Sequence, residues 1–474
     1  MNSLKGKIEH VVVLMLENRS LDNMMGFLYP SGKTPRGDTF EGIAPNSYSN
    51  TAPEVGEVEA QLITPPPSGA CVTNPDPDPG EGFYHVNVEL NTTGSPPLGD
   101  NSGFLVDYLN VTQSAALAPN IMLSYAPEQV PVTSLLAREF AVSDQWFCSA
   151  PTETFPNRLY VAAGTSAGLL YDEPLFDPTF LFGVLRRLPT VFNLLSDSGK
   201  TWKSYFHDVA FNWVLAQDGG FLSPNIEQYD LHFEQDLRGD DFPAYAFIEP
   251  AYAFFPNDQH PPHDVTAGEA LVADVYNRIR RSKYWEKTLL IITYDEHGGC
   301  YDHVTPPPAI PPDEIHSRPY HRYPNDPVFN FDRYGLRVPA IFVSPYIEAG
   351  TVVRTNPGLY DPPNPPPVPP STLPVPLPFD HTTIIKTLSS LFDLKSSSTG
   401  QSYLTERDRA APDLGDYLPL GDKVLDKPES VVPPKVPFHC RLNFDLSTER
   451  LQKFLQLRHL VGEARHEESL EGRD

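Results

Sequence analysis

Two continuous apolar runs, far apart in the chain, dominate its hydrophobic pattern. Residues 10–16 read His-Val-Val-Val-Leu-Met-Leu, and residues 289–294 read Leu-Leu-Ile-Ile-Thr-Tyr. Uninterrupted runs of this length are typical of parallel strands that are buried on both faces. We therefore predict that both runs form central strands of a sheet.

Both runs end abruptly in adjacent polar residues. Glu17 and Asn18 follow the first run, and Asp295 and Glu296 follow the second. In open α/β sheets the chemistry collects at the carboxyl ends of the strands, so we expect these side chains to converge. Three buried carboxylates repel one another, and a cation bound between them and the amide oxygen resolves that repulsion. The pattern predicts a metal-dependent enzyme.

Helices and further strands alternate along the rest of the chain. Helical periodicity covers residues 268–283 and 382–392, and extended runs cover residues 201–206, 245–248 and 338–343. Strands that alternate with helices favour an α/β fold with a mostly parallel sheet.

The 53 prolines are clustered and mark loops, because proline lacks the backbone donor that helices and central strands need. The densest cluster lies in residues 360–378 and predicts an extended surface insertion. We predict a catalytic domain at residues 1–415, which contains this insertion, and a C-terminal extension at residues 416–474. The apolar positions in residues 451–461 predict a docked terminal helix ahead of a charged tail.

The charge balance restricts the partners. With 35 basic and 61 acidic residues, the formal net charge is −26. This charge argues against nucleic acid as a partner and disfavours electrostatic adhesion to anionic lipid. No apolar stretch of the roughly 18 residues that a transmembrane helix needs is visible, so membrane contact is expected to be peripheral at most.

Neither the cysteines nor the N-terminus suggests an export pathway. The four cysteines are widely scattered and form no metal-binding or disulfide framework, so we expect reduced or buried thiols; they are Cys71, Cys148, Cys300 and Cys440. The first residues contain no signal peptide, which predicts a cytoplasmic protein, or a secreted one if a leader was removed before this numbering.

A turn-rich segment, residues 148–160, leads into an apparent helix and carries further candidate chemistry. A hydroxyl at a helix entrance is first a capping candidate. Asn157 and Arg158 add an amide and a guanidinium, which suit phosphate oxygens. If this segment folds over the acidic residues, a metal would activate a threonine hydroxyl as a nucleophile.

A competing motif lies nearby. Residues 164–168 match the G-x-S-x-G pattern of a nucleophile elbow, which requires a strand directly before the serine. Residues 158–163 look helical, so we expect residues 164–168 to form a small-residue turn after that helix.

Four separated blocks, in order, resemble the phosphoesterase family of bacterial phospholipases C and acid phosphatases, which also has plant non-specific phospholipases C as relatives. The resemblance extends from about residue 8 to about residue 414. It implies an alkaline-phosphatase-like fold, with a central, mostly parallel sheet between helical layers. The matching blocks are residues 17–22, 156–160, 294–304 and 379–382.

The resemblance also implies roles for single residues. It assigns metal binding to the four residues at the strand ends, and it makes Thr154 the nucleophile and a further metal contact. Oxygen ligands suit Mg²⁺, Ca²⁺ or Mn²⁺, with iron and zinc left open. The expected metal ligands are Glu17, Asn18, Thr154, Asp295 and Glu296.

Several histidines are implied to line the phosphate pocket. We expect His260 to protonate the leaving group, with His85 and His207 as further catalytic candidates. Some relatives place their histidine where Glu81 stands. The expected substrate contacts are Asn157, Arg158, His303 and His381.

One position departs from the family pattern, because this chain has Asn23 where relatives usually have a histidine. That change bears on the substrate class more than on the chemistry. We expect a metal-dependent phosphoric ester hydrolase that acts through a phosphothreonine. A phospholipase C is preferred, a phosphatase of soluble monoesters is the alternative, and a non-catalytic binding protein on the same fold is a third hypothesis.

Overall fold

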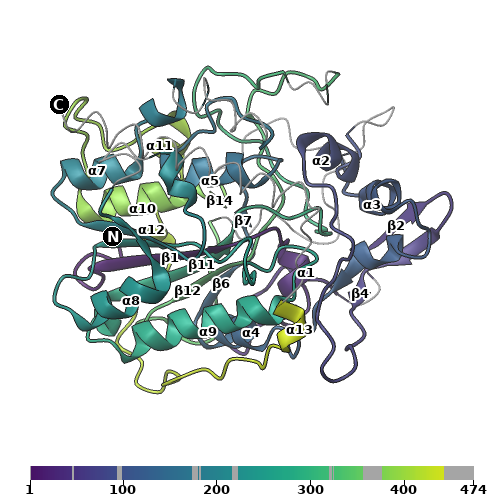
Figure 1. Cartoon of the computed structure of the whole chain (residues 1–474), viewed down its shortest axis with the longest axis horizontal. Helices are drawn as coiled ribbons and strands as arrows, with labels where there is room; N and C mark the ends of the chain where they lie inside the picture. Colours follow the sequence, from purple (N-terminus) through teal and green to yellow (C-terminus); the bar gives the residue numbers. More distant parts are fainter. Residues whose placement is uncertain are drawn as a thin grey trace.

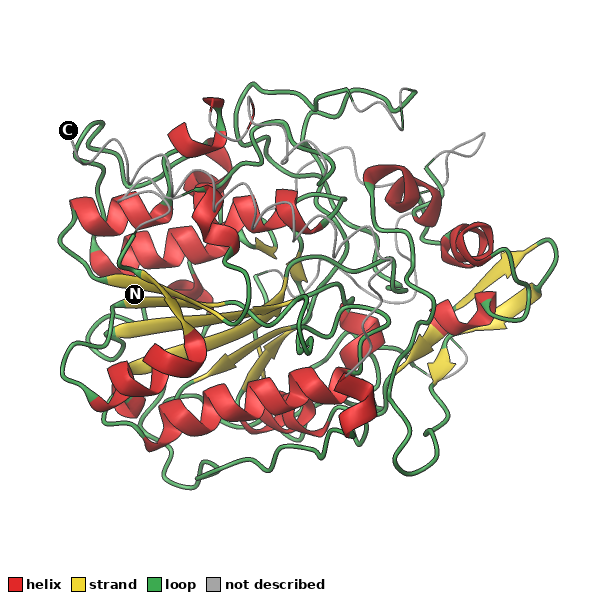
Figure 2. Ribbon diagram, viewed as in Figure 1, coloured by secondary structure: helices red, strands yellow, loops and turns green. Residues whose placement is uncertain are grey.

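A central sheet of eight strands organises the protein in a computed structural model (Figures 1 and 2). The structure describes residues 2–44, 47–92, 99–172, 180, 183–215, 223–319, 323, 325–355 and 376–441. The strand order is β13-β6-β12-β11-β1-β10-β8-β9. The bounds are β1 His10–Leu16, β6 Ala141–Ser143, β8 Trp202–Phe206, β9 Ile226–Gln228, β10 Tyr245–Ile248, β11 Thr288–Tyr294, β12 Ala340–Val343 and β13 Thr351–Val352.

The two apolar runs form the neighbouring central strands β1 and β11, as predicted. They pair in parallel over their whole length, from His10 opposite Thr288 to Leu16 opposite Tyr294. Every residue of both strands is buried. Strand β10 pairs in parallel with the other side of β1, whereas β12 runs antiparallel to β11 and β6. The sheet is therefore mostly parallel, which confirms the expected fold class.

Helices cover both faces of this sheet (Figure 2). On one face lie α4 Pro131–Glu139, α8 Tyr229–Arg238 and α9 Val265–Arg281, and on the other lie α5 Thr154–Ala163, α7 Val191–Asp197 and α10 Thr382–Phe392. The predicted helices at residues 268–283 and 382–392 correspond to α9 and α10. Asp264 caps α9 by accepting a hydrogen bond from the Thr266 N–H at 2.8 Å.

A second region projects beyond the sheet and has its own hydrophobic cluster (Figure 1). It contains α2 Phe83–Glu89, α3 Phe104–Thr112, and the hairpin of β2 Ser49–Ala52 and β3 Gly56–Glu59. The remaining elements are α1 Leu21–Met25, β4 Gln61–Leu62, β5 Leu123–Ser124, β7 Trp146–Phe147, β14 Phe379–Asp380, α11 Glu406–Ala410, α12 Leu414–Tyr417, α13 Phe438–Arg441 and 3-10 helices at Ala118–Met122, Leu185–Arg187, Phe211–Val214 and Trp285–Lys287.

The chain after α12 runs along α9 to a disulfide. Asn277 on α9 exchanges two hydrogen bonds with the backbone of Val431, at 2.9 and 2.8 Å. Cys440 is then bonded to Cys71, so the expectation of reduced thiols is wrong for this pair. The two cysteines are 369 residues apart, and spacing gives no sign of such a pairing. The remaining cysteines of the described chain are free and buried.

Other predictions concern parts outside the described residues. The proline-rich insertion lies there except for residues 376–378, and so does the expected terminal helix at residues 451–461. The domain division at residue 415 stays a prediction. Within the described residues, no helix combines the length and apolar character needed to cross a bilayer.

Candidate active site

The parallel pairing of β1 and β11 brings four predicted metal ligands to one edge of the sheet. The Asn18 N–H donates to Asp295 Oδ1 at 3.0 Å, which ties the two strand ends together. Asn18 has a left-handed backbone, with φ of 54°, and this conformation turns the chain sharply after the strand. Glu17, Asn18, Asp295 and Glu296 are all fully buried.

Arg158 supplies positive charge to this group of carboxylates. Its Nε lies 3.0 Å from Asp295 Oδ2, and its Nη2 lies 3.5 Å from Glu17 Oε1. The side chain is only 1% exposed. Its guanidinium therefore contacts the predicted ligands directly in this structure, and the expected contact with substrate stays a prediction.

Thr154 meets the strand ends at the start of α5. Its Oγ1 donates to Asn18 Oδ1 at 3.1 Å, and the residue is 6% exposed. The first residue of a helix lies at the positive end of the helix dipole, which favours phosphate oxygens. The structure thus places the predicted nucleophile beside a predicted metal ligand.

The turn before Thr154 is held by Asn157. The Asn157 amide accepts from the Ala150 N–H at 3.0 Å and donates to the carbonyls of Ala150, Thr152 and Glu153 at 2.9 to 3.1 Å. Asn157 therefore fixes the chain that leads into α5. Its role toward substrate stays a prediction.

The rival nucleophile-elbow interpretation does not fit the structure. Helix α5 occupies the positions before residues 164–168, and it ends at Gly164, whose φ is 72°. A helix therefore stands where the elbow needs a strand. The small-residue turn predicted for this segment is confirmed.

Two carboxylates that the sequence reasoning missed extend the group. Asn18 Nδ2 donates to Glu81 Oε2, and His260 Nε2 lies 3.6 Å from the same oxygen. The other ring nitrogen of His260 lies 3.6 Å from Asp78 Oδ1. Asp78 and Glu81 belong to a loop without periodic pattern. The only signal was that some relatives place their histidine where Glu81 stands.

His297 is a further missed residue, and it orients Glu296. Its Nε2 lies 2.8 Å from Glu89 Oε2 and its Nδ1 lies 3.2 Å from Glu296 Oε2. The Gly298 N–H donates to the same Glu296 oxygen at 2.7 Å. The position of His297 directly after Asp295 and Glu296 was a usable signal.

The charges of the site are strongly coupled to burial. Burial raises the pKa of Glu296 to about 8, despite the opposing bond from His297, and burial also raises the pKa of Asp295. Burial opposes protonation of His260, yet Asp78 and Glu81 raise its pKa to about 10. Asp78 and Glu81 therefore favour the imidazolium form of His260, whereas burial favours the neutral forms of Asp295 and Glu296.

Two other predicted histidines have partners outside this group. His85 Nδ1 lies 3.0 Å from Asp107 Oδ1, on the projecting region. His207 Nδ1 donates to the Glu249 carbonyl at 2.7 Å, and its ring stacks on Tyr229. Burial lowers the pKa of His207. The catalytic roles of His85 and His207 stay predictions.

His381 binds the backbone of Asp295. Its Nε2 donates to the Asp295 carbonyl at 2.6 Å, and its Nδ1 accepts from Trp146 Nε1 at 3.2 Å. Burial lowers the pKa of His381 to about 4, so the ring is neutral. In this structure His381 holds the Asp295 backbone, and its predicted contact with substrate is untested.

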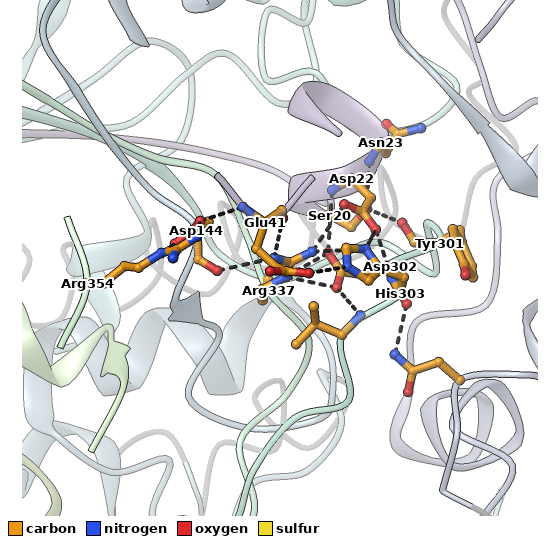
Figure 3. A network of polar contacts seen from close by, with 12 residues as sticks. Ser20, Asp22, Asn23, Glu41, Asp144, Tyr301, Asp302, His303, Arg337 and Arg354 are labelled. Carbon is orange, nitrogen blue, oxygen red and sulfur yellow. Dashed lines mark hydrogen bonds and ion pairs between the residues drawn. The ribbon is translucent and has the colours of Figure 1, made fainter. Parts of the chain in front are cut away.

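His303 belongs to a buried ion network beside α1 (Figure 3). Its Nδ1 lies 2.6 Å from Asp22 Oδ2, and its Nε2 lies 3.3 Å from Glu41 Oε1. Arg337 completes the network at 3.1 Å from Asp22 Oδ1 and 3.0 Å from Asp302 Oδ1. The bonds of His303 link it to Asp22 and Glu41. Its predicted contact with substrate stays a prediction.

Asn23, the departure from the family pattern, lies next to this network (Figure 3). Its Nδ2 donates to the Leu123 carbonyl at 3.0 Å, and its Oδ1 accepts from Arg19 Nη1 at 3.2 Å. Arg19 in turn donates to the Gln259 carbonyl at 2.6 Å, directly before His260. Asn23 therefore helps to hold Arg19, which in turn binds the backbone directly before His260.

The types of donor atom at the strand ends suit a hard divalent cation. Glu296 Oε1 is buried without a hydrogen-bond partner among the described residues, and the available donors are carboxylate, amide and hydroxyl oxygens. In the described chain, Asp78, Glu81 and His260 have ligand atoms that all lie within 4.8 Å of one another. Glu17, Asp295 and Glu296 do not form such a close group. Arg158 bonds to both Glu17 and Asp295 in that set.

Comparison with known proteins decides the family. The model of the Phosphoesterase family matches residues 8–395. The chain belongs to the Phosphoesterase family. Non-specific phospholipase C6 of Arabidopsis thaliana is 35% identical over 426 residues, which cover 87% of this phosphoesterase and 72% of the relative. Non-specific phospholipase C1 of the same plant is 32% identical over 449 residues, with 92% and 75% covered.

A bacterial relative and one solved structure extend the comparison. Phospholipase C B of Mycobacterium tuberculosis is 27% identical over 430 residues, covering 81% of this phosphoesterase and 73% of the relative. A protein of the alkaline phosphatase superfamily from Vibrio parahaemolyticus aligns with a TM-score of 0.32 and 13% identity, covering 71% and 81%. The α/β fold is shown by this chain's own sheet and helices.

Family membership makes the protein a phosphoric ester hydrolase, as expected from the sequence. Phosphoesterases of this kind are generally metal-dependent, and the described residues contain groups able to bind a metal. The recognition of the family from four short blocks is confirmed.

Proposed function

We propose that this phosphoesterase is a phospholipase C that cleaves a phospholipid to diacylglycerol and a phosphorylated headgroup. The observation that carries the proposal is the contact of Thr154 Oγ1 with Asn18 Oδ1, where a hydroxyl at a helix start meets the buried acidic strand ends. Relatives from a plant and a bacterium that cover most of the chain are named phospholipases C, which supports this choice of substrate.

The residues of the chain divide the reaction into two steps. Thr154 releases its hydroxyl proton to solvent and its Oγ attacks phosphorus, which forms a phosphothreonine that still carries the headgroup, while the bond from phosphorus to the diacylglycerol oxygen breaks. His260, kept protonated by Asp78 and Glu81, gives its proton to the departing oxygen. Water then attacks phosphorus and gives one proton to His260, while the bond from phosphorus to Thr154 Oγ breaks. The phosphorylated headgroup leaves, and Thr154 Oγ takes a proton from solvent to regain its hydroxyl.

Five residues would hold the metal, namely Glu17, Asn18, Thr154, Asp295 and Glu296. A divalent cation bound there would lower the proton affinity of the hydroxyl and stabilise negative charge on the phosphoryl oxygens. Oxygen donors favour Mg²⁺, Ca²⁺ or Mn²⁺. Arg158 would keep Glu17 and Asp295 in place from the protein side.

Two substrates assayed side by side test the proposal. Metal-reconstituted protein is given phosphatidylcholine vesicles and p-nitrophenyl phosphate, each with a chelator control. Release of phosphocholine that stops with chelator is the expected result. Turnover of the monoester alone would replace the phospholipase by a phosphatase, and no turnover of either ester would favour a binding protein.

The nucleophile is tested by the Thr154→Ala variant. Loss of the attacking oxygen should lower kcat by at least about a thousandfold with a nearly unchanged thermal midpoint. Ser166→Ala is the matched control, because it removes the hydroxyl of the rival motif and should keep most activity. Acid-quenched wild-type enzyme should contain a phosphorylated peptide at Thr154, and unchanged turnover of Thr154→Ala would remove the assignment.

A further inference from the structure

The loop after β10 presents two adjacent phenyl rings to solvent. Phe254 is 44% exposed and Phe255 is 49% exposed. Exposing neighbouring large apolar side chains is unfavourable in water, and such patches mark surfaces that bind an apolar partner. The two rings therefore form a small exposed apolar patch on this loop.

Hydrogen bonds hold this loop in one shape. The Asp208 carboxylate accepts backbone N–H groups from Tyr252 at 3.1 Å, from Ala253 at 2.8 Å and from Phe254 at 3.0 Å. Asn257 closes the base of the loop, since its Oδ1 accepts from the Ala251 N–H at 2.7 Å. The two phenyl rings are thus carried on a fixed support.

The base of the loop lies at the edge of the sheet that carries the candidate active site. The Glu17 N–H donates to the Asp258 carbonyl at 2.9 Å, so the end of the loop touches the end of β1. His260, the proposed proton donor, follows two residues later. A surface that bound the phenyl rings would therefore lie beside the site.

A pocket of about 430 Å³ lies between this loop and helices α8 and α9. Its lining includes the aromatic rings of His207, Tyr229 and both phenylalanines. Three carboxylates also line the pocket, namely Asp208, Asp230 and Asp274.

The charge of this pocket selects the kind of partner. Among the described residues, neither lysine nor arginine lines it. Asp274 is paired with Arg278, and Asp208 accepts backbone amides, whereas Asp230 is exposed in the first turn of α8. Carboxylates beside aromatic rings suit an organic ammonium group and repel an anion.

We propose that the loop of residues 251–257 and the pocket behind it dock the protein on a zwitterionic phospholipid bilayer. The phenyl rings of Phe254 and Phe255 insert between headgroups, and Asp230 faces the ammonium groups of choline or ethanolamine lipids. This proposal rests on the proposed phospholipase function. The net charge of −26 opposes adhesion to anionic lipid, so apolar insertion into a neutral surface is the route left to this protein.

The full-length Phe254→Ser/Phe255→Ser variant tests the proposal. Its binding to phosphatidylcholine vesicles, measured by co-sedimentation, should fall about tenfold or more, and vesicle hydrolysis should fall in parallel. Hydrolysis of a short-chain phosphatidylcholine below its micelle concentration should not change. The control is Leu425→Ser/Val432→Ser, at two apolar residues that are 86% and 84% exposed outside this loop, and it should bind as wild type does.

Lipid composition supplies the second measurement. Wild type should bind phosphatidylcholine vesicles more tightly than phosphatidylglycerol vesicles, with little effect of added salt on the former. The Asp230→Asn variant should show a smaller difference in affinity between phosphatidylcholine and phosphatidylglycerol vesicles. Equal vesicle binding by wild type and the double phenylalanine variant, or no binding by either, would overturn the docking surface.

The two proposals fail in different ways. Hydrolysis of monomeric lipid without any dependence of vesicle binding on the phenyl rings would leave the phospholipase and remove the docking surface. Binding to vesicles that depends on the rings, without hydrolysis of any phospholipid, would leave the docking surface and remove the phospholipase.

Discussion

Gly298 allows the two strand ends of the site to approach each other. Its φ is 63°, and a Cβ at this position would clash with the carbonyl oxygen of Asn18. Its N–H also binds Glu296 at 2.7 Å. A side chain here would therefore displace one predicted metal ligand, Asn18, and disturb the hydrogen bond to another, Glu296.

We expect Gly298→Ala to lower activity sharply, because Asn18 would have to move. Gly199→Ala is the matched control, since Gly199 has a similar φ of 66° but open space around its Cβ position. Backbone strain alone should cost Gly199→Ala about 1–2 kcal/mol of unfolding free energy and leave activity intact. Equal activity of the two variants would contradict the close approach at Asn18.

His303 predicts a pH dependence of stability. Burial disfavours its charged form, yet Asp22 and Glu41 raise its pKa from 6.5 to about 9. A base with a raised folded-state pKa stabilises fully below pH 6.5, and that stabilisation is lost as pH rises through 9. The shift corresponds to roughly 3 kcal/mol.

Urea unfolding of wild type and His303→Gln between pH 6 and 10 (roughly the span of the two pKa values) measures this effect. The free-energy gap between the two proteins should be largest near the lower end and should shrink as pH rises. A free-energy gap that stays constant over this range would show that the pKa of His303 does not change on folding.

At the level of residues, sequence reasoning found those parts of the site that strands position. Glu17, Asn18, Asp295 and Glu296 follow buried apolar runs, and parallel pairing necessarily brings such ends together. Asp78 and Glu81 lie on a loop, where no periodicity predicts what the chain approaches. Their place beside Asn18 and His260 needed the folded structure.

Among the elements, the loop that carries Asp78 and Glu81 is tied to the C-terminal segment. Cys71 precedes this loop and is bonded to Cys440, while the Val72 N–H reaches the capping carboxylate of α9, Asp264, at 3.3 Å. The disulfide thus holds one side of the site to α9 and to the chain that runs along it.

Removal of this disulfide should lower stability. Cys71→Ser/Cys440→Ser should lose about 2–4 kcal/mol of unfolding free energy, because the unfolded chain gains freedom. Thermal midpoints measured with and without reductant check this. Reduction should bring wild type down to the level of the variant and leave the variant itself unchanged.

The elements that could be predicted were those with a strong pattern. Continuous apolar runs identified β1 and β11, and helical periodicity identified α9 and α10. The hairpin of β2 and β3 was missed because most of its positions are exposed, and because the alternating buried positions of β2 are Asn50 and Ala52, which give no apolar pattern in the sequence. The antiparallel direction of β12 was missed too, since strand direction depends on the path of the connecting chain.

For the whole molecule, we predict that stability depends on a bound cation, because carboxylates are buried within an acidic protein. Three predicted carboxylate ligands are fully buried while the chain carries a net charge of −26. A ligand that binds only the folded state stabilises it by mass action. Folding and catalysis should therefore respond to the same ion.

Chelation should lower the thermal midpoint by a few degrees, and added Mg²⁺, Ca²⁺ or Mn²⁺ should restore it. Asp295→Asn should show a smaller response together with a lower metal content in the purified protein. Glu9→Gln, at an exposed residue paired with Lys287, is the control and should respond as wild type does. A thermal midpoint that does not change on chelation would show that no bound metal stabilises the folded state.

The bond between Cys71 and Cys440 also changes the topology of the molecule. Residues 71–440 form a closed covalent ring, from which the first 70 residues and the C-terminal residues extend as tails. Glu17 and Asn18 lie on a tail, whereas Thr154 and Asp295 lie in the ring. A protease that cuts the ring once cannot separate the pieces, so the nicked protein would keep its full mass until it is reduced.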